Sequence, residues 1–201
     1  AALARRTIVA TTVSNVAAGK PRAAGGVWLG PAGTTLPADA GTVLGAGFKA
    51  GGYIGEDGLT ETVGRSTEKV KAWGGDTVKV LQTDFSVTYQ FTFIESLNGD
   101  VLKAVYGAAN VTTTAATSSA GTKQAVKITA DQLPHQVFVF EIKDGDARVR
   151  IVVPDGQITE VGDVTYNDGS VIGYQVTVEA FRDSTLGAQA VKYTDDGKFS
   201  A

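Results

Sequence analysis

Few residues in this chain could support catalysis or bind a metal. Its 201 residues include one histidine, His135, and no cysteine, so the usual set of zinc ligands and a Cys–His catalytic pair are missing. His135 follows Pro134 in an expected loop, and a general base would have to be this histidine or a carboxylate. Gly33-Thr34-Thr35 lacks the lysine of a phosphate-binding loop, and Gly45-Ala46-Gly47 lacks the third glycine of a dinucleotide-binding fingerprint. We therefore expect no enzymatic activity and no cofactor.

Several aspartates stand beside glycine, as calcium ligands often do. They are Asp144 and Asp146, Asp155, Asp168, and Asp195 and Asp196. The twelve-residue loop with a terminal glutamate that marks an EF-hand is absent. Aspartate beside glycine is already explained as a turn residue, because its carboxylate accepts hydrogen bonds from nearby backbone N–H groups. We expect turns at these positions and no metal site.

The net charge of −3 argues against a protein that binds duplex nucleic acid, because such proteins neutralise phosphates with a basic face or stripe. No apolar run is long enough to span a membrane, and polar residues at positions 11–15 interrupt the apolar centre that a signal peptide needs. We expect residues 1–24 to form an extended arm and residues 25–201 to form one β domain. The arm is basic, with Arg5, Arg6, Lys20 and Arg22 and no acid before Asp39.

The remaining elements are organised around residues 71–107. Val87, Tyr89, Phe91 and Phe93 alternate with polar residues, which is typical of a half-buried strand. Residues 77–82 form a second β-branched run, and Thr83-Asp84 interrupts the pattern between them. We interpret these runs as two antiparallel strands, with one long bent strand as the alternative.

A short helix over about residues 98–106 should follow. Asn98 is a good N-cap residue, Asp100 is favoured in the first turn by the helix dipole, and Gly107 ends the pattern. The helix is too short to be stable alone, so its apolar stripe should pack on the sheet. The expected helix–sheet core is Leu97, Val101, Leu102, Val105 and Tyr106.

Further strands are expected at residues 27–30, 125–130, 137–142, 148–153, 157–164 and 171–181. Asp144-Gly145, Pro154-Asp155-Gly156 and Asn167-Asp168-Gly169 are turn signals between the last four, which should form an antiparallel meander. Long loops are expected at about residues 31–52 and 112–121, where large apolar residues are scarce. Trp73 precedes two glycines, and we favour a core position for it over an exposed contact.

The region from about Gly26 to Lys198 resembles the major tail tube proteins of long non-contractile-tailed bacteriophages, particularly those of actinobacterial hosts. The resemblance is carried by the turn WGGDTV, the long alternating strand, the segments FTFIESLN and DVLKAVYG, and the later segments GQITEVGDVTYNDGSVIGYQVTVEAFRDS and KYTDDGK. It implies a mainly β fold, an antiparallel β-sandwich or barrel with one short flanking helix and long loops. The basic leader and the threonine-rich loop at residues 112–121 depart from the family's pattern.

The resemblance also implies a structural virion protein that is assembled in the host cytoplasm and resides in the phage tail. Its copies would form hexameric rings, stacked into a tube through which DNA passes without specific binding. Expected partners are further copies of itself, a tape measure protein and a tail terminator.

Two sets of residues follow as candidates for this assembly. The polar faces of two strands are candidates for the lumen, with a solvent-facing outer surface as the alternative: Ser86, Thr88, Gln90, Thr92, Gln175, Thr177 and Glu179. The arm and the two long loops are candidates for ring-to-ring contacts, since a stacking surface could order them. The candidate contact residues are Arg5, Arg6, Lys20, Arg22, Phe48 and Trp73.

Two other functions remain open at this point. One is a tail terminator or the tube protein of a contractile injection system. The other is an extracellular β-sandwich that binds carbohydrate or another surface ligand. Such a module should carry aromatic residues on an exposed face, whereas Tyr89, Phe91 and Phe93 lie on the face expected to form the core.

Overall fold

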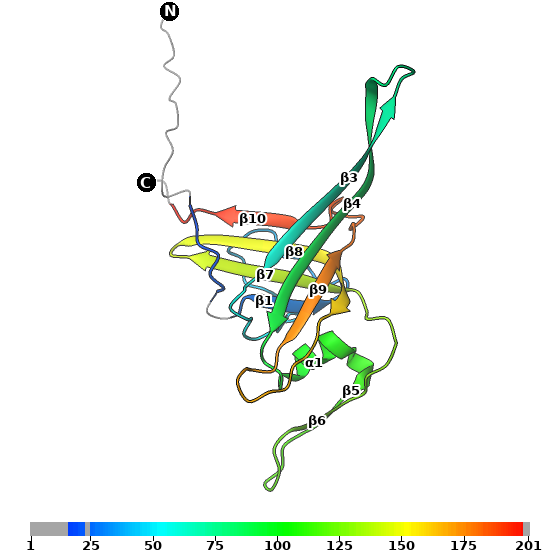
Figure 1. Ribbon diagram of the computed structural model, residues 1–201. Coiled ribbons are helices and arrows are strands. Elements are labelled where there is room, and N and C mark those ends of the chain that lie inside the picture. Colours follow the sequence, from blue (N-terminus) through cyan, green and yellow to red (C-terminus); the bar gives the residue numbers. More distant parts are fainter. Residues whose placement is uncertain (1–15, 23–24, 199–201) are drawn as a thin grey trace, which may run out of the picture.

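The computed structural model describes residues 16–22 and 25–198, and it confirms a mainly β, antiparallel fold with one α-helix (Figure 1). The first elements are β1 (Val27–Pro31), β2 (Lys49–Ala50), β3 (Thr60–Lys71), β4 (Thr77–Phe93), α1 (Gly99–Tyr106) and the 3₁₀ turn η2 (Ala108–Asn110). The later elements are β5 (Val111–Thr114), β6 (Lys123–Val126), β7 (Gln136–Asp144), β8 (Ala147–Val161), β9 (Tyr174–Ala180) and β10 (Val191–Asp195).

The main sheet has the order β2-β1-β7-β8-β9-β4-β3, and β10 also pairs with β8. The long strand β8 connects two halves of this sheet. Its first half lies between β7 and β10, and its second half pairs with β9. Because Gln136 pairs with Gly156 while Phe138 pairs with Val153, the register shifts at Pro154–Gly156 and the strand bends there. The expected break into two strands at this turn signal is therefore wrong.

The core lies between the two halves of the sheet. Tyr89 and Phe91 on β4 contact Phe140 on β7, with ring centroids 5.2 Å and 5.4 Å apart. Val87, Tyr89, Phe91 and Phe93 are all buried, so the alternation of β4 places its apolar face in the core. These cross-layer contacts give the chain the packed inner faces of a β-sandwich.

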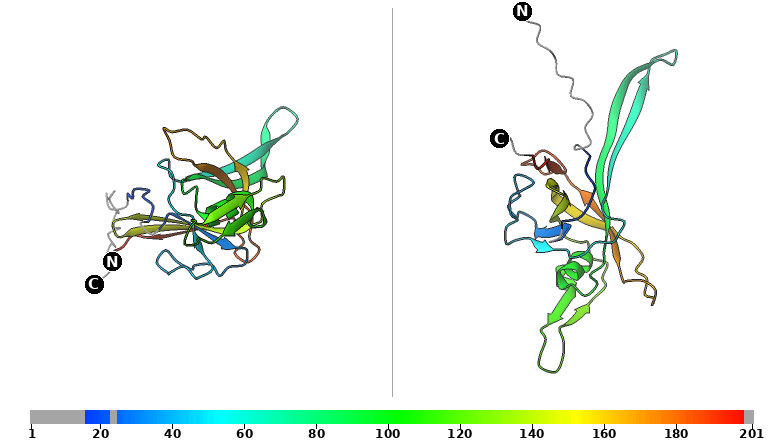
Figure 2. Two further views of the ribbon diagram at one scale, coloured as in Figure 1. Left: turned by 90° about the horizontal axis from the view of Figure 1, so that it is seen from below. Right: turned by 90° about the vertical axis from the view of Figure 1, so that its left-hand side faces the viewer.

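Strands β3 and β4 form a hairpin that extends well beyond the rest of the sheet (Figures 1 and 2). The single strand β4 corresponds to the alternative of one long strand, and the interpretation as two strands is wrong. Ser66 pairs with Asp84 while Thr67 pairs with Gln82, so Thr83 is the extra residue of a β-bulge. The interruption seen at Thr83-Asp84 is thus a bulge within a strand rather than a turn.

Helix α1 begins after Asn98, whose side chain accepts a hydrogen bond from the backbone N–H of Asp100 at 3.0 Å. Val101, Leu102 and Val105 are buried, and Tyr106 packs against Tyr174 with ring centroids 5.8 Å apart. Leu97 does not belong to this core, because it precedes the N-cap and its side chain is 88% exposed. The expectation for Leu97 is therefore wrong.

The two expected long loops differ from expectation in different ways. Residues 112–121 are only partly a loop, because Val111–Thr114 and Lys123–Val126 pair as the hairpin β5–β6, which projects beyond α1 (Figure 1). The expected strand at residues 125–130 is reduced to the part that lies in β6. Residues 31–52 are mostly irregular, but β2 pairs with β1 near their end.

Candidate assembly surfaces

The seven residues predicted to line a lumen lie together on one face of the sheet. In the antiparallel pair of β4 and β9, Thr88 faces Glu179, Gln90 faces Thr177 and Thr92 faces Gln175, and paired residues share a face. Ser86 lies on the same face of β4. None of the seven is buried, whereas their neighbours Val176 and Val178 on the opposite face are fully buried.

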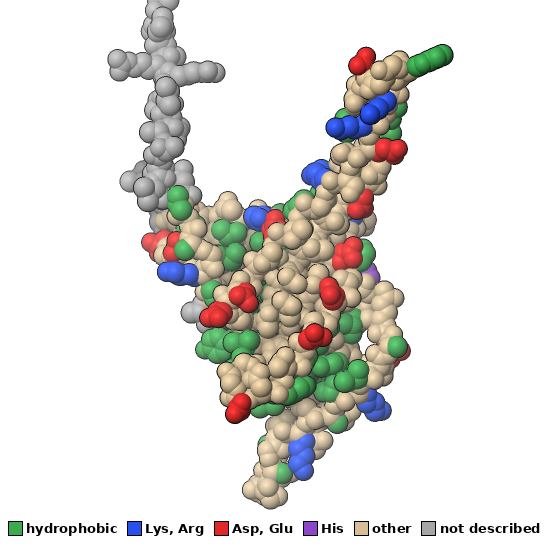
Figure 3. All heavy atoms as spheres, viewed as in Figure 1, with side chains coloured by type: hydrophobic (Ala, Val, Ile, Leu, Met, Phe, Trp, Pro, Cys, Tyr) green, Lys and Arg blue, Asp and Glu red, His purple; other side chains and the backbone are tan. Residues whose placement is uncertain are grey.

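The same polar face continues across the neighbouring strands. Thr60 and Thr62 of β3 pair with Gln90 and Thr88, and Glu160 of β8 pairs with Thr177. These cross-strand neighbours add hydroxyls and a carboxylate but no cation. The space-filling view facing this sheet shows acidic side chains scattered over it, with the basic ones mostly on the β3–β4 hairpin and toward the margins (Figure 3). We call this surface, formed by β3, β4, β9 and the second half of β8, the polar sheet face.

Both edges of the polar sheet face are unpaired among the described residues. β3 pairs only with β4, and residues 159–161 of β8 pair only with β9 and are exposed. An unpaired edge presents free backbone N–H and C=O groups that can bind another strand.

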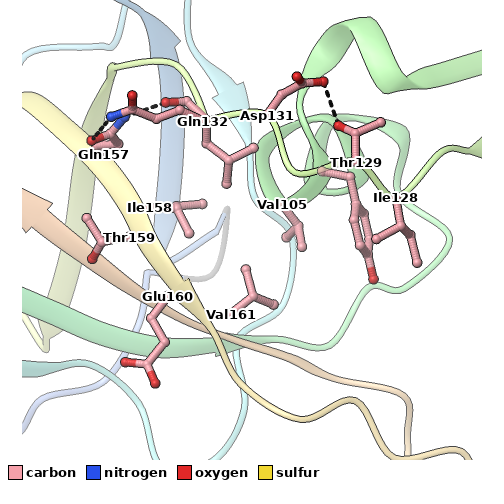
Figure 4. Close-up of a pocket in the computed structure, with 12 residues that line it drawn as sticks. Val105, Ile128, Thr129, Asp131, Gln132, Gln157, Ile158, Thr159, Glu160 and Val161 are labelled. Atoms are coloured by element: carbon pink, nitrogen blue, oxygen red, sulfur yellow. Dashed lines mark hydrogen bonds between the residues drawn. The ribbon is translucent and has the colours of Figure 1, made fainter.

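A groove with a volume of about 440 Å³ runs along the β8 edge between this strand, α1 and the segment before β7 (Figure 4). Its wall includes Val105, Ile128 and Val161, and it carries the carboxylates of Asp131 and Glu160. The Ile128 side chain is 83% exposed. The groove thus places apolar surface next to an open strand edge.

The turn of the β3–β4 hairpin carries Trp73 at its tip. Its side chain is fully exposed, so the expectation that it anchors the core is wrong, and only the alternative of an exposed contact residue remains. The turn is closed by backbone hydrogen bonds from Ala72 to Asp76 and from Gly75 to Ala72. Gly74 and Gly75 have φ values of 113° and 98°, which residues with a Cβ atom rarely adopt. The glycines are therefore required by the turn rather than by a crowded core.

The arm residues that the structure describes are attached to the body. Pro21 bridges to Ile142, the N–H of Lys143 donates to the carbonyl of Lys20, and the N–H of Ala18 donates to the Asp144 carboxylate at 2.8 Å. Arg5 and Arg6 lie outside the described residues. The contact role predicted for them remains untested.

Arg22 has an internal partner. Its guanidinium donates to both carboxylate oxygens of Glu141, at 3.1 Å and 3.2 Å, so it is half-exposed but already paired within the chain. This pairing leaves the contact role predicted for Arg22 untested, and that role stays a prediction.

Glu141 is the centre of a buried polar network that composition and spacing did not predict. Its carboxylate also accepts hydrogen bonds from Arg150 and from the indole N–H of Trp28, the latter at 3.1 Å. Arg150 donates in addition to the backbone carbonyl of Asp39 at 2.7 Å. Glu141 and Arg150 are 4% and 1% exposed. The network therefore joins the arm, β7, β8 and the loop at residues 31–52.

The same loop is held by Phe48, which was predicted to be a contact residue. Phe48 is buried with Val137, Val139 and Val152, which gives it a packing role within the chain, and the contact role predicted for it stays a prediction. Near Asp39 the chain turns sharply. Hydrogen bonds from the Thr42 hydroxyl and from the N–H groups of Thr42 and Gly41 lower the pKa of the Asp39 carboxyl.

His135, the histidine considered as a general base, pairs with a carboxylate of β8. His135 lies 2.5 Å from the Asp155 carboxylate, which ties the loop before β7 to the bend of β8.

Within residues 16–22 and 25–198, no three His, Cys, Asp or Glu side chains are grouped so that they could hold a metal ion. In the same part of the chain, no helix combines the length and apolar character needed to span a membrane.

A comparison with protein families gives one finding that covers most of the chain. The family model described as "Phage tail tube protein" matches residues 17–198. None of the curated proteins matches the chain.

Proposed function

The chain belongs to the phage tail tube protein family, and we propose that its copies form hexameric rings that stack into a tail tube for genome delivery. The observation that carries this proposal is the polar sheet face with its two open edges. A lone protein with such edges risks uncontrolled aggregation. A ring of copies removes both edges at once, because closing a sheet into a barrel leaves no terminal strand.

The edges suggest how the ring closes. In this proposal the β3 edge of one copy lies beside the β8 edge of the next, in the groove of Figure 4. Repetition around an axis then gives one continuous wall of antiparallel strands. Each copy supplies β8, β9, β4 and β3 in that order. The apolar wall of the groove would add burial to the strand pairing.

The chemistry of the polar sheet face suits the inner surface of such a wall. Ser86, Thr88, Gln90, Thr92, Gln175, Thr177 and Glu179 offer hydroxyls, amides and a carboxylate. Their cross-strand neighbours Thr60, Thr62 and Glu160 add no cation. Strong binding of DNA depends on neutralising its phosphates with Lys or Arg. A lumen of this composition would therefore let DNA pass without holding it.

A tape measure protein and a tail terminator would be the further partners of the tube.

The test is the state of assembly of the purified chain and of two variants, by sedimentation and negative-stain electron microscopy over a range of concentrations. Wild-type protein should give particles of six protomers of 20.7 kDa each, and tubes built from them. Ile128→Lys places a charge in the groove and should leave the protein monomeric. Val43→Lys, at a residue that is 84% exposed and on neither edge, should still form rings. A wild-type chain that stays monomeric at all concentrations would count against the proposal.

A further inference from the structure

The Trp73 side chain is fully exposed, so it packs against none of the residues that the structure describes. It stands at the tip of a hairpin whose outer half is exposed on both faces, from Ser66 to Lys71 and from Thr77 to Asp84. A free two-stranded hairpin is marginally stable in water. Val78 and Val80 of the same hairpin are also exposed. Such an apolar tip is the kind of anchor that binds into a pocket of a partner.

A second cavity lies at the opposite end of β4. It has a volume of about 390 Å³ and is lined by Pro21, Arg22, Tyr53, Ile54 and Glu95, together with several glycines. Ile54 bridges to Phe93, the last residue of β4, whereas Trp73 lies just before the first residue of that strand. A strand of 17 residues spans roughly 55 Å. The cavity and the tip are thus separated by the length of β4. In Figure 1, accordingly, the hairpin turn lies at one end of β4 and α1 lies near the other end of this strand.

The lining of this cavity suits an indole ring. Proline and tyrosine rings pack against aromatic faces, and a guanidinium attracts the π-system of tryptophan. Glu95 already accepts hydrogen bonds from the N–H of Tyr53 at 2.8 Å and from the Asn98 amide at 3.0 Å. Its carboxylate has further lone pairs for an indole N–H. Gly52 makes room for Glu95, because a Cβ atom on this glycine would lie 2.1 Å from the carboxyl carbon.

The charges of the two ends are also complementary. Residues 69–80 around the tip contain Lys69, Lys71 and Lys79 against one acid, Asp76. The segments around the cavity, residues 52–58 and 94–100, contain four carboxylates and no lysine or arginine, and Arg22, which also lines it, is paired with Glu141. Approach of the tip to the cavity would therefore bring opposite charges together, which favours association and makes it sensitive to salt.

From these observations we infer that Trp73 of one copy inserts into the Pro21–Tyr53–Glu95 cavity of a copy in the adjacent ring. The inference rests on the proposed tube, and it names the contact that stacks one ring on the next. The contact is heterologous, since tip and cavity are different surfaces of the same chain. A heterologous contact repeated along an axis extends without limit, as a tube requires.

The first experiment compares tube formation by wild-type protein, Trp73→Ala and Tyr166→Ala. Tyr166 is a matched control because it is 71% exposed on the loop between β8 and β9 and belongs neither to the tip nor to the lining of the cavity. Trp73→Ala should still form single rings but should require at least about a tenfold higher concentration to form tubes, as expected for loss of a central anchor. Tyr166→Ala should behave as wild type. Because Trp73 is fully exposed, its replacement should not impair folding.

The second experiment locates the partner of the tip. The chain has no cysteine, so Ala72→Cys, an exposed neighbour that leaves Trp73 in place, and Tyr53→Cys can be prepared separately, mixed and treated with a short bismaleimide. Assembled tubes should yield cross-linked dimers, and replacing Tyr53→Cys by Tyr166→Cys should abolish them. Tubes from Trp73→Ala at the wild-type concentration, or tubes without the Ala72–Tyr53 cross-link, would overturn this inference and leave the tube function intact. If wild-type protein formed neither rings nor tubes, the proposed function would fail, and this inference with it.

Discussion

Among single residues, Arg150 and Glu141 stand out because they are charged and almost completely buried. Burial of a charge is costly unless it is paired and fully hydrogen-bonded. Here Glu141 is shared by Arg150, Arg22 and Trp28, and Arg150 also holds the carbonyl of Asp39. One carboxylate thus fixes the start of the domain and the loop at residues 31–52 to the sheet.

Replacing Arg150 should destabilise the protein, because Glu141 would lose its buried partner. In Arg150→Met the buried charge of Glu141 keeps only Arg22 and Trp28 as hydrogen-bond donors. We expect the free energy of unfolding to fall by about 3 kcal/mol. Glu141→Leu combined with Arg150→Met should lose less than the single change, because no buried charge is left. Urea denaturation measures both, with Arg148→Met at an exposed position as the control. A loss below about 0.5 kcal/mol for Arg150→Met would contradict this account.

Tyr89 should make stability depend on pH in the alkaline range. Burial, and secondarily the negative charge of Glu61 opposite it on β3, raise the pKa of the Tyr89 phenol above its usual value of 10.0. The unfolded chain therefore releases this proton first, and the free energy of unfolding should fall as the pH rises above 10. Denaturation at pH 9 to 11 should show a smaller decline for Tyr89→Phe than for wild type. An equal decline would show that Tyr89 does not contribute.

At the scale of elements, helix α1 offers a matched pair of leucines. Leu102 is 6% exposed and packs in the core, whereas Leu97 is 88% exposed just before the helix. Leu102→Ala should lower the free energy of unfolding by about 2–5 kcal/mol through lost burial and a cavity. Leu97→Ala should change it by less than about 0.5 kcal/mol. Thermal and urea denaturation would check both, and similar losses at the two positions would be inconsistent with the helix described above.

The elements differ in how well the sequence predicts them. The alternation of Val87 to Phe93 predicts β4 correctly, and Asn98 and Gly107 predict the limits of α1, because these signals are local. The bend of β8 at Pro154–Gly156 and the bulge at Thr83 were interpreted as turns, since a turn and a bulge use the same residue types. Only the pairing of distant strands decides between them.

For the candidate site residues too, the sequence does not reveal contacts between distant segments. The alternation of residue types predicts that the polar residues share one face of β4 and one face of β9. That these two faces form a single surface follows only from the pairing of the two strands in the tertiary fold. The partners of Phe48 and Arg22 within the chain, Val139 and Glu141, were not predicted because they are distant in sequence. For Trp73, the paired glycines suggested a crowded core, whereas they serve the turn at a hairpin tip.

At the scale of the whole molecule, the chain has features that a lone domain does not need. The polar sheet face ends in two open edges, and the β3–β4 hairpin extends far from the core (Figure 2). Apolar side chains are exposed at both ends, including Trp73 at the hairpin tip and Leu97 and Ile128 near α1. Lateral closure of the edges and axial stacking of tip on cavity would cover these features together.

The most direct test of this account is a cryo-electron microscopy map of the tubes formed by the wild-type chain. It should show six-fold rings with β3 of each copy beside the β8 edge of the next. Ser86, Thr88, Gln90, Thr92, Gln175, Thr177 and Glu179 should line the lumen. A map in which these side chains lie on the outer surface of the tube would contradict the account.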